Sequence, residues 1–172
     1  MKEETKIYER GLEEYPKSEI LWQNIIIILI FAIAFLGMYS IQISGIPILS
    51  LIYLGYVIVV LVFVLRKHLC TSCYYYDKWC TVGWGKLASC LFKKNSGNFE
   101  LGGKIAGIFW PSVMIIPVLA MAISLILNFS TTVLILLIAF LVLNAANFSR
   151  RKKSCGRCKM RFICPGSAAK KM

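Results

Sequence analysis

The fold is decided by residues 21–65, which read LWQNIIIILIFAIAFLGMYSIQISGIPILSLIYLGYVIVVLVFVL. These 45 residues contain no Asp, Glu, Lys or Arg, and residues 105–149 form a second charge-free stretch of the same length. About 20 apolar residues are enough to cross the hydrocarbon core of a bilayer as one helix. Each stretch is therefore too long for one membrane helix and fits two helices joined by a tight turn.

The composition supports a membrane location for both stretches. The chain of 172 residues is 58% hydrophobic, with a mean hydropathy of +0.70, which lies outside the range of soluble globular proteins. The sequence therefore predicts an all-α integral membrane protein. Its four transmembrane helices are expected near residues 21–43, 47–65, 105–127 and 131–148, with turns at 44–47 and 128–131.

The basic residues predict how these helices are oriented. Four Lys and Arg precede the first stretch, seven lie between the stretches and nine follow the second, whereas neither predicted turn contains one. Short loops rich in Lys and Arg stay in the cytoplasm. We expect a multi-pass protein of the cell membrane with both termini cytoplasmic. Orientation and attraction to anionic membrane lipids explain the net charge of +12, and no nucleic-acid recognition motif accompanies it.

The two halves of the chain repeat the same pattern of cysteines. Cys70-x2-Cys73-x6-Cys80 follows the first stretch, and Cys155-x2-Cys158-x5-Cys164 follows the second, at offsets of 85, 85 and 84 residues. A constant offset indicates an internal repeat, here of two parallel hairpins related by an axis along the membrane normal. The predicted organisation is an N-terminal segment (1–20), hairpin 1 (21–65), a Cys-rich loop (66–104), hairpin 2 (105–149) and a Cys-rich tail (150–172).

The predicted cytoplasmic location of all seven cysteines points to metal binding. Structural disulfides are rare in a reducing compartment, and a Cys-x2-Cys pair directs two sulfurs toward one ion. Two four-ligand sites need two more ligands than the six repeated cysteines provide. Cys90 and His68, the only histidine, are the candidates. The sequence leaves open which site each would complete, and whether the two sets form separate sites or one.

The tail cysteines also resemble a known cofactor-binding segment. The run Cys155-Gly-Arg-Cys158-Lys-Met-Arg-Phe-Ile-Cys164-Pro-Gly resembles the auxiliary iron–sulfur segment of SPASM-type radical enzymes. The resemblance covers this short segment alone, and the Cys-x3-Cys-x2-Cys motif of the catalytic cluster in those enzymes is missing. It implies one or two [4Fe-4S] clusters, not that enzyme activity. The loop set, Cys70, Cys73 and Cys80, departs from the pattern by one residue, and structural zinc is the alternative.

Residues around the cysteines fit a negatively charged cofactor. Basic side chains would offset the charge of a thiolate-bound cluster, and aromatic side chains would shield the loop site from water or form an interfacial belt. The basic candidates are Lys78, Lys86, Arg157, Lys159 and Arg161, and the aromatic ones are Tyr74, Tyr75, Tyr76, Trp79 and Trp84. Ile7, Tyr8, Leu12 and Tyr15 have the spacing of a short surface helix, with a disordered tail as the alternative.

Three functions remain open on the sequence. The first is electron transfer between a cytoplasmic redox partner and a membrane carrier through clusters at the bilayer surface. The second is a zinc-stabilised membrane scaffold or subunit that docks a partner protein. The third is a thiol–disulfide redox enzyme, so catalytic activity is left undecided. Ion-coupled transport is disfavoured because the predicted helices have no ionisable residue at membrane depth.

Overall fold

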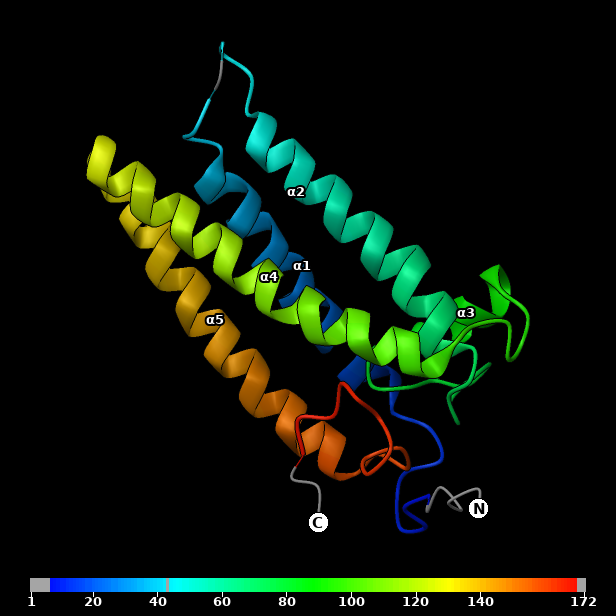
Figure 1. The fold of residues 1–172 in the computed structure, drawn as a ribbon. Helices are drawn as coiled ribbons and strands as arrows, with labels where there is room; N and C mark the ends of the chain where they lie inside the picture. Colours follow the sequence, from blue (N-terminus) through cyan, green and yellow to red (C-terminus); the bar gives the residue numbers. More distant parts are fainter. Residues whose placement is uncertain (1–6, 43, 170–172) are drawn as a thin grey trace.

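The computed structural model describes residues 7–42 and 44–169, and this part of the chain is helical without any β-strand. Its long helices are α1 (Lys17–Met38), α2 (Ile48–Ile58), α4 (Phe99–Leu127) and α5 (Thr131–Gly156) (Figure 1). α2 continues through two π-helical segments, η1 (Val59–Val64) and η2 (Arg66–Cys70), to form one span. A short helix, α3 (Trp84–Leu91), lies outside the bundle. The four spans are each long and apolar enough to cross a membrane, as the sequence predicts.

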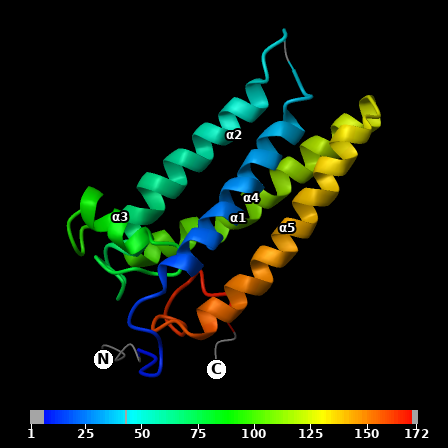
Figure 2. The ribbon, with the colours of Figure 1, turned by 180° about the vertical axis from the view of Figure 1, so that it is seen from behind.

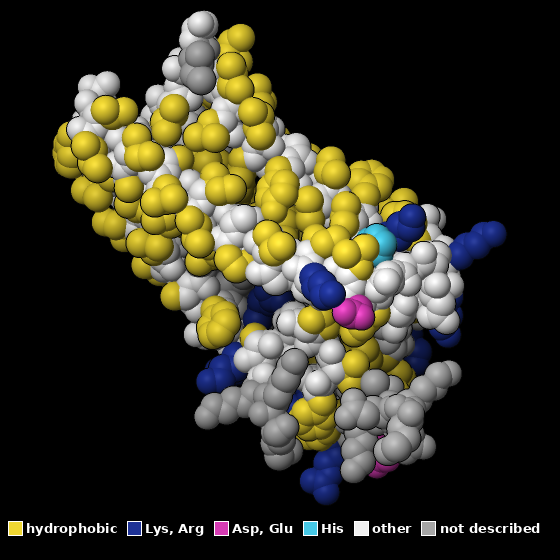
Figure 3. Space-filling view, in the orientation of Figure 1, with side chains coloured by type: hydrophobic (Ala, Val, Ile, Leu, Met, Phe, Trp, Pro, Cys, Tyr) yellow, Lys and Arg dark blue, Asp and Glu magenta, His cyan; other side chains and the backbone are white. Residues whose placement is uncertain are grey.

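The helices run side by side, and α1 contacts all three of the others. The connections at 39–47 and 128–130 lie at one end of the bundle (Figures 1 and 2). The N-terminal segment, α3 and the tail lie together at the opposite end. Apolar side chains cover the visible flank of the bundle, whereas Lys and Arg gather at the end that holds the tail (Figure 3). The molecule therefore has an apolar body and one basic, polar end.

Four predicted helix boundaries are wrong because we took charged residues as helix limits, and one of them is the end of the second helix, which continues past residue 65 to Cys70. α1 begins directly after Pro16, and α4 begins directly after Asn98. Asn98 caps α4, since its Oδ1 accepts a hydrogen bond from the Leu101 N–H at 3.0 Å. α5 continues through its basic residues to Gly156, because charged side chains at the bilayer surface do not interrupt the backbone hydrogen bonds of a helix. The first helix is also shorter than predicted at its far end, where it stops at Met38.

The core between the helices combines apolar packing with a few hydrogen bonds. Its fully or almost fully buried side chains include Ala34, Met38, Tyr53, Phe109, Met121 and Phe140. Gln23 Nε2 donates to Asn147 Oδ1 at 2.6 Å, which joins α1 to α5. Tyr56 and Ser112 join α2 to α4 through their hydroxyls at 2.8 Å. Polar residues within the apolar stretches thus link neighbouring helices.

The Gln23–Asn147 hydrogen bond gives a first testable prediction. Because Gln23 is buried, we expect a double-mutant cycle of Gln23→Leu and Asn147→Leu to give a coupling of about 0.6 kcal/mol, and at most about 1.7 kcal/mol. The measurement is reversible unfolding in mixed detergent micelles. A cycle of Gln23→Leu with Asn128→Leu is the control, because Asn128 is exposed at the opposite end of the bundle. Equal couplings in the two cycles would contradict the prediction.

Candidate metal centre

The six repeated cysteines come from four segments that meet at the basic end of the bundle: η2, the loop after it, α5 and the tail. Cys70 ends η2, and Cys73 and Cys80 follow it in the loop that leads to α3. Cys155 lies in the last turn of α5, and Cys158 and Cys164 lie in the tail. The side chains of all six are neither fully buried nor fully exposed.

The loop and tail sets are interleaved rather than separate. Cys70 interacts electrostatically with Cys80 of its own set and with Cys164 of the tail. Cys73 interacts with the same two sulfurs and with Cys70. Cys164 also interacts with Cys158, which has Cys155 as a further neighbour. Cys164 therefore lies within electrostatic range of both the loop set and Cys158, so the two sets are neighbours at this end of the bundle.

The thiols are neighbours, but they are not arranged as a finished coordination shell. Within residues 7–42 and 44–169, no three His, Cys, Asp or Glu side chains are close enough together to hold a metal ion. Binding a metal would therefore require the sulfurs to converge. Four of the thiols are placed for such movement, because all four pack against the same small apolar cluster. The thiols are those of Cys73, Cys80, Cys158 and Cys164, and the cluster is formed by Tyr15, Ile20, Tyr75 and Met160.

The surroundings of the thiols favour their protonated form. Burial raises the pKa of the Cys73 thiol, and the charges of Cys70, Cys80 and Cys164 raise it further. Burial likewise raises the pKa of Cys158 to about 11, with smaller contributions from Cys164 and Cys155. A metal ion would have to displace these protons on binding.

Residues 8–15, which we call the N-terminal strap, hold the loop and the tail together. The strap is irregular, not the surface helix that its apolar spacing predicts, because three of its backbone N–H groups bond to other segments and only the Gly11 N–H bonds within the strap, to Tyr8 O, among the described residues. The Tyr8 N–H donates to Lys159 O and the Leu12 N–H to Arg157 O, each at 2.9 Å. The Tyr15 N–H donates to Trp79 O at 2.9 Å. The strap thus bonds to the tail at two points and to the loop at a third.

Two tyrosines reinforce this connection. The Tyr15 hydroxyl donates to Ser154 O at 2.7 Å, and the Tyr75 hydroxyl donates to Leu12 O at 2.6 Å. Tyr75 also accepts a hydrogen bond from the Lys159 N–H at 3.2 Å, and its side chain is only 1% exposed. The tyrosine run therefore contributes at least one buried residue, Tyr75, against whose cluster Cys73, Cys80 and Trp79 pack.

Most of the basic residues expected to balance a cofactor are already paired with carboxylates. Arg157 contacts Glu19 at 2.8 Å, and Lys86 contacts Asp77 at 2.8 Å. Lys159 and Lys78 both pair with Glu13 of the strap. Arg161 instead stacks on Tyr8 and Phe162, and its Nε is buried without a hydrogen-bond partner.

Arg66 is a cation near the thiols that was not predicted from the sequence to balance a cofactor. Arg66 is only 3% exposed, and its guanidinium lies 4.0 Å from the ring centroid of Trp84. Its Nε donates to Leu61 O at 3.3 Å, while its Nη1 is buried without a hydrogen-bond partner. Its nearest opposite charges would be those of Cys70 and Cys80. Its position one helical turn before Cys70 could have indicated this contact from the sequence. There, Arg66 was counted only among the basic residues that orient the helices.

The two candidate extra ligands lie apart from this arrangement. Cys90 is exposed on α3 and interacts electrostatically with Lys86. His68 Nδ1 accepts a hydrogen bond from the Asn98 N–H at 3.1 Å, which commits that nitrogen to the start of α4. The six repeated cysteines therefore lie at this end of the bundle without these two residues beside them, and their role as ligands stays a prediction.

Comparison with known proteins returns no relative: no protein-family model, curated protein or solved structure matches the chain.

The ion pairs of the strap give a prediction for pH. Hydrogen bonds from Lys159 and Tyr74 lower the pKa of Glu13 from 4.5 to about 2. A lowered pKa in the folded state means that this contact stabilises the strap above pH 4.5 and is lost as the pH falls toward 2. We expect the carboxyl carbon signal of labelled Glu13 to titrate near pH 2, and Lys159→Met to move the midpoint toward 4.5. A midpoint near 4.5 in the unaltered protein would contradict this contact.

Proposed function

We propose that the protein is a membrane-anchored metal-binding protein that carries an iron–sulfur cluster at the cytoplasmic face and takes part in electron transfer. The proposal assigns the four apolar helices to anchoring and the thiol cluster to the cofactor. Its expected cofactor is [4Fe-4S], and the interleaving of the two cysteine sets favours one composite centre over two independent ones.

The observation that carries the proposal is the buried charge of Arg66. An arginine cannot lose its proton in proteins, and a buried cation without an anion costs several kcal/mol. Among the described residues, Arg66 has no carboxylate in an ion pair, whereas Cys70 and Cys80 are its electrostatic neighbours. Protonated thiols do not balance the charge. Thiolates that hold a metal cofactor would, because such a centre is negative overall.

Four thiols are the best candidates for the ligands. Cys70, Cys73, Cys80 and Cys164 are linked by mutual electrostatic contacts, and four cysteines are the usual ligand set of an iron–sulfur cluster. Such a cluster supplies one-electron chemistry. Cys155 and Cys158 lie beside this set and are available to a second metal ion or as alternative ligands.

The parallel repeat and the cytoplasmic orientation belong to the same proposal. Arg66 stacks on Trp84, and Arg151, which lies 85 residues later, stacks on Trp110 at 4.6 Å from the ring centroid. The spacing equals the offset of the first two cysteines, so it supports two related halves. The gathering of Lys and Arg at the thiol end supports a cytoplasmic location for this end and for both termini.

The proposal includes a cytoplasmic redox partner protein in addition to the surrounding lipids. A hollow of about 550 Å³ next to the thiol cluster is lined by Cys73, Lys78 and Lys94, among other residues. Lys78 is paired with Glu13, so the exposed Lys94 is the cation of this hollow that favours a partner with an acidic surface, because opposite charges speed the encounter of two proteins.

The alternatives are distinguished by metal content and by thiol chemistry. Zinc would suit the same thiols and would hold the loop, the tail and the strap together in a scaffold. A thiol–disulfide enzyme is less favoured, because reactive cysteines have a lowered pKa, whereas the pKa values of Cys73 and Cys158 are raised.

Metal analysis of single-cysteine variants tests the proposal. Anaerobically purified protein should contain iron and sulfide and should show a broad visible absorption band that fades on reduction. Cys164→Ser should remove most of this absorption, because Cys164 connects the loop and tail sets. Cys90→Ser is the matched control and should leave the spectrum unchanged, since Cys90 is exposed and outside the cluster. Zinc with no iron would establish the scaffold alternative, and protein without any metal would refute both.

The role of Arg66 gives a separate prediction. Replacing Arg66 with Gln removes a buried positive charge that would stabilise the more negative, reduced cluster. The midpoint potential of the Arg66→Gln variant should therefore shift to more negative values in a redox titration. Lys67→Gln is the control, because Lys67 is the exposed neighbour of Arg66 and its charge is screened by water. An equal shift in both variants would contradict a specific role for Arg66.

A further inference from the structure

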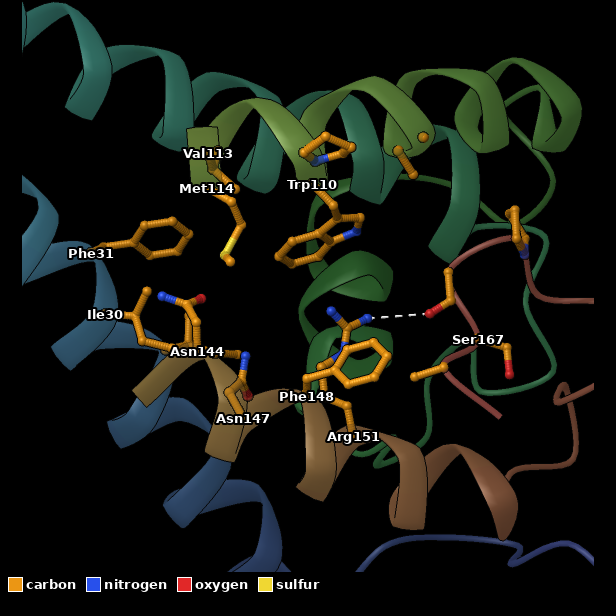
Figure 4. Close-up of a pocket in the computed structure, with 17 residues that line it drawn as sticks. Ile30, Phe31, Trp110, Val113, Met114, Asn144, Asn147, Phe148, Arg151 and Ser167 are labelled. Atoms are coloured by element: carbon orange, nitrogen blue, oxygen red, sulfur yellow. Dashed lines mark hydrogen bonds between the residues drawn. The ribbon is translucent and has the colours of Figure 1, made fainter. Parts of the chain in front are cut away.

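A cavity of about 380 Å³ lies inside the basic end of the bundle, between α1, α4, α5 and the tail. Figure 4 shows Trp110 and Met114 on α4 facing the same space as Asn144 and Asn147 on α5, with Phe31 on α1 closing one side. The tail contributes residues 165–168, which follow Cys164 directly. A molecule in this cavity would therefore contact the segment next to a proposed cluster ligand.

The lining divides into an apolar part and a polar part. Ile27, Ile30, Phe31, Val113 and Met114 supply apolar surface within the span. Arg151 and Ser167 supply polar groups toward the tail, whereas Asn144 and Asn147 supply neutral polar groups beside Ile30, deeper in the span (Figure 4). A cavity with this division suits an amphipathic ligand whose tail lies in the membrane and whose polar head lies near the surface.

The two asparagines have hydrogen-bonding capacity that the bundle does not use. Asn147 accepts from Gln23 through its Oδ1, and its amide nitrogen has no partner among the described residues. Asn144 donates to Phe140 O at 2.8 Å, and its carbonyl oxygen has no partner in the same part of the chain. The cavity thus offers one neutral donor and one neutral acceptor, placed one helical turn apart.

The charged group of the cavity is already engaged. Arg151 lies 4.6 Å from the centroid of the Trp110 ring, and its Nη2 donates to Gly166 O at 3.3 Å. It therefore holds the tail loop against α4 at the mouth of the cavity. This use of Arg151, together with neutral amides and aromatic walls, favours an uncharged planar head group over a phosphate.

We infer that this cavity binds the head group of an isoprenoid quinone from the membrane pool. The ring would lie against Trp110, the carbonyl or hydroxyl oxygens would bond to Asn144 and Asn147, and the isoprenoid tail would follow the apolar part. This inference deepens the proposed function and rests on it in one respect: the quinone would be the membrane carrier that exchanges electrons with the cluster. Binding itself does not require the metal.

A glycine on the cavity wall permits a test that leaves the fold intact. Gly107 lines the cavity, and a Cβ added there would meet no atom within 4 Å. Gly107→Leu should therefore fill the cavity without a clash and should strengthen the helix. Gly55→Leu is the matched control, since Gly55 also has no atom within 4 Å of an added Cβ but lies on α2, away from the cavity.

The experiment measures binding of a naphthoquinone with one isoprene unit to the full chain in lipid nanodiscs, with empty nanodiscs as the blank. We expect Gly107→Leu to weaken binding at least about tenfold, which corresponds to 1.4 kcal/mol, and Gly55→Leu to have no effect. Asn144→Leu, which removes the neutral acceptor, should weaken binding by a smaller factor. Binding no stronger than to the blank, or equal binding by both glycine variants, would overturn the inference.

Two further measurements separate this inference from the proposed function and from its nearest competitor. Iron content is determined in the same samples. Iron-loaded protein that does not bind the quinone overturns the inference alone. Protein without metal that binds the quinone supports the inference and overturns the proposed function. Native mass spectrometry identifies lipid that remains bound. An anionic phospholipid that is lost in Arg151→Gln and that the quinone does not displace would show that lipid fills the cavity, and the inference would then be wrong.

Discussion

The hydrocarbon core of a bilayer offers no hydrogen bonds to the backbone, and the rest of this structure depends on that constraint. Two charge-free stretches of 45 residues must form helices there, and each must turn back once. Both turns then fall at one end of the bundle, and both cysteine runs fall at the other (Figures 1 and 2). The membrane therefore brings two distant motifs to one place before any contact between them forms.

Contacts outside the bilayer convert this proximity into a defined site. The loop and the tail are too short to build a large core, and the apolar cluster between them has only four buried residues. The N-terminal strap adds what they lack, since it bonds to Arg157 and Lys159 in the tail and to Trp79 in the loop. Three segments from different parts of the chain thus depend on one another, which explains why neither cysteine run forms the site alone.

Charge links this site to the membrane part of the molecule. The surface cations near the thiols are largely neutralised by carboxylates, whereas Arg66 at the end of its span is not. Arg151, near the end of α5, holds the loop after Cys164 against Trp110. Arg66 therefore connects the thiols with the helices through its charge, and Arg151 connects them through packing at the mouth of the cavity.

The sequence by itself determined the four spans, the common end for the cysteines and the identity of the thiols, because hydropathy and cysteine spacing are local properties. It placed helix ends wrongly where Asn98 caps a helix and where α5 continues through its basic residues. Only the tertiary structure decided that Cys164 joins the loop set, that the strap is irregular, that Arg66 is buried and that a cavity adjoins the tail. These features depend on contacts between residues far apart in the chain, which no local pattern encodes.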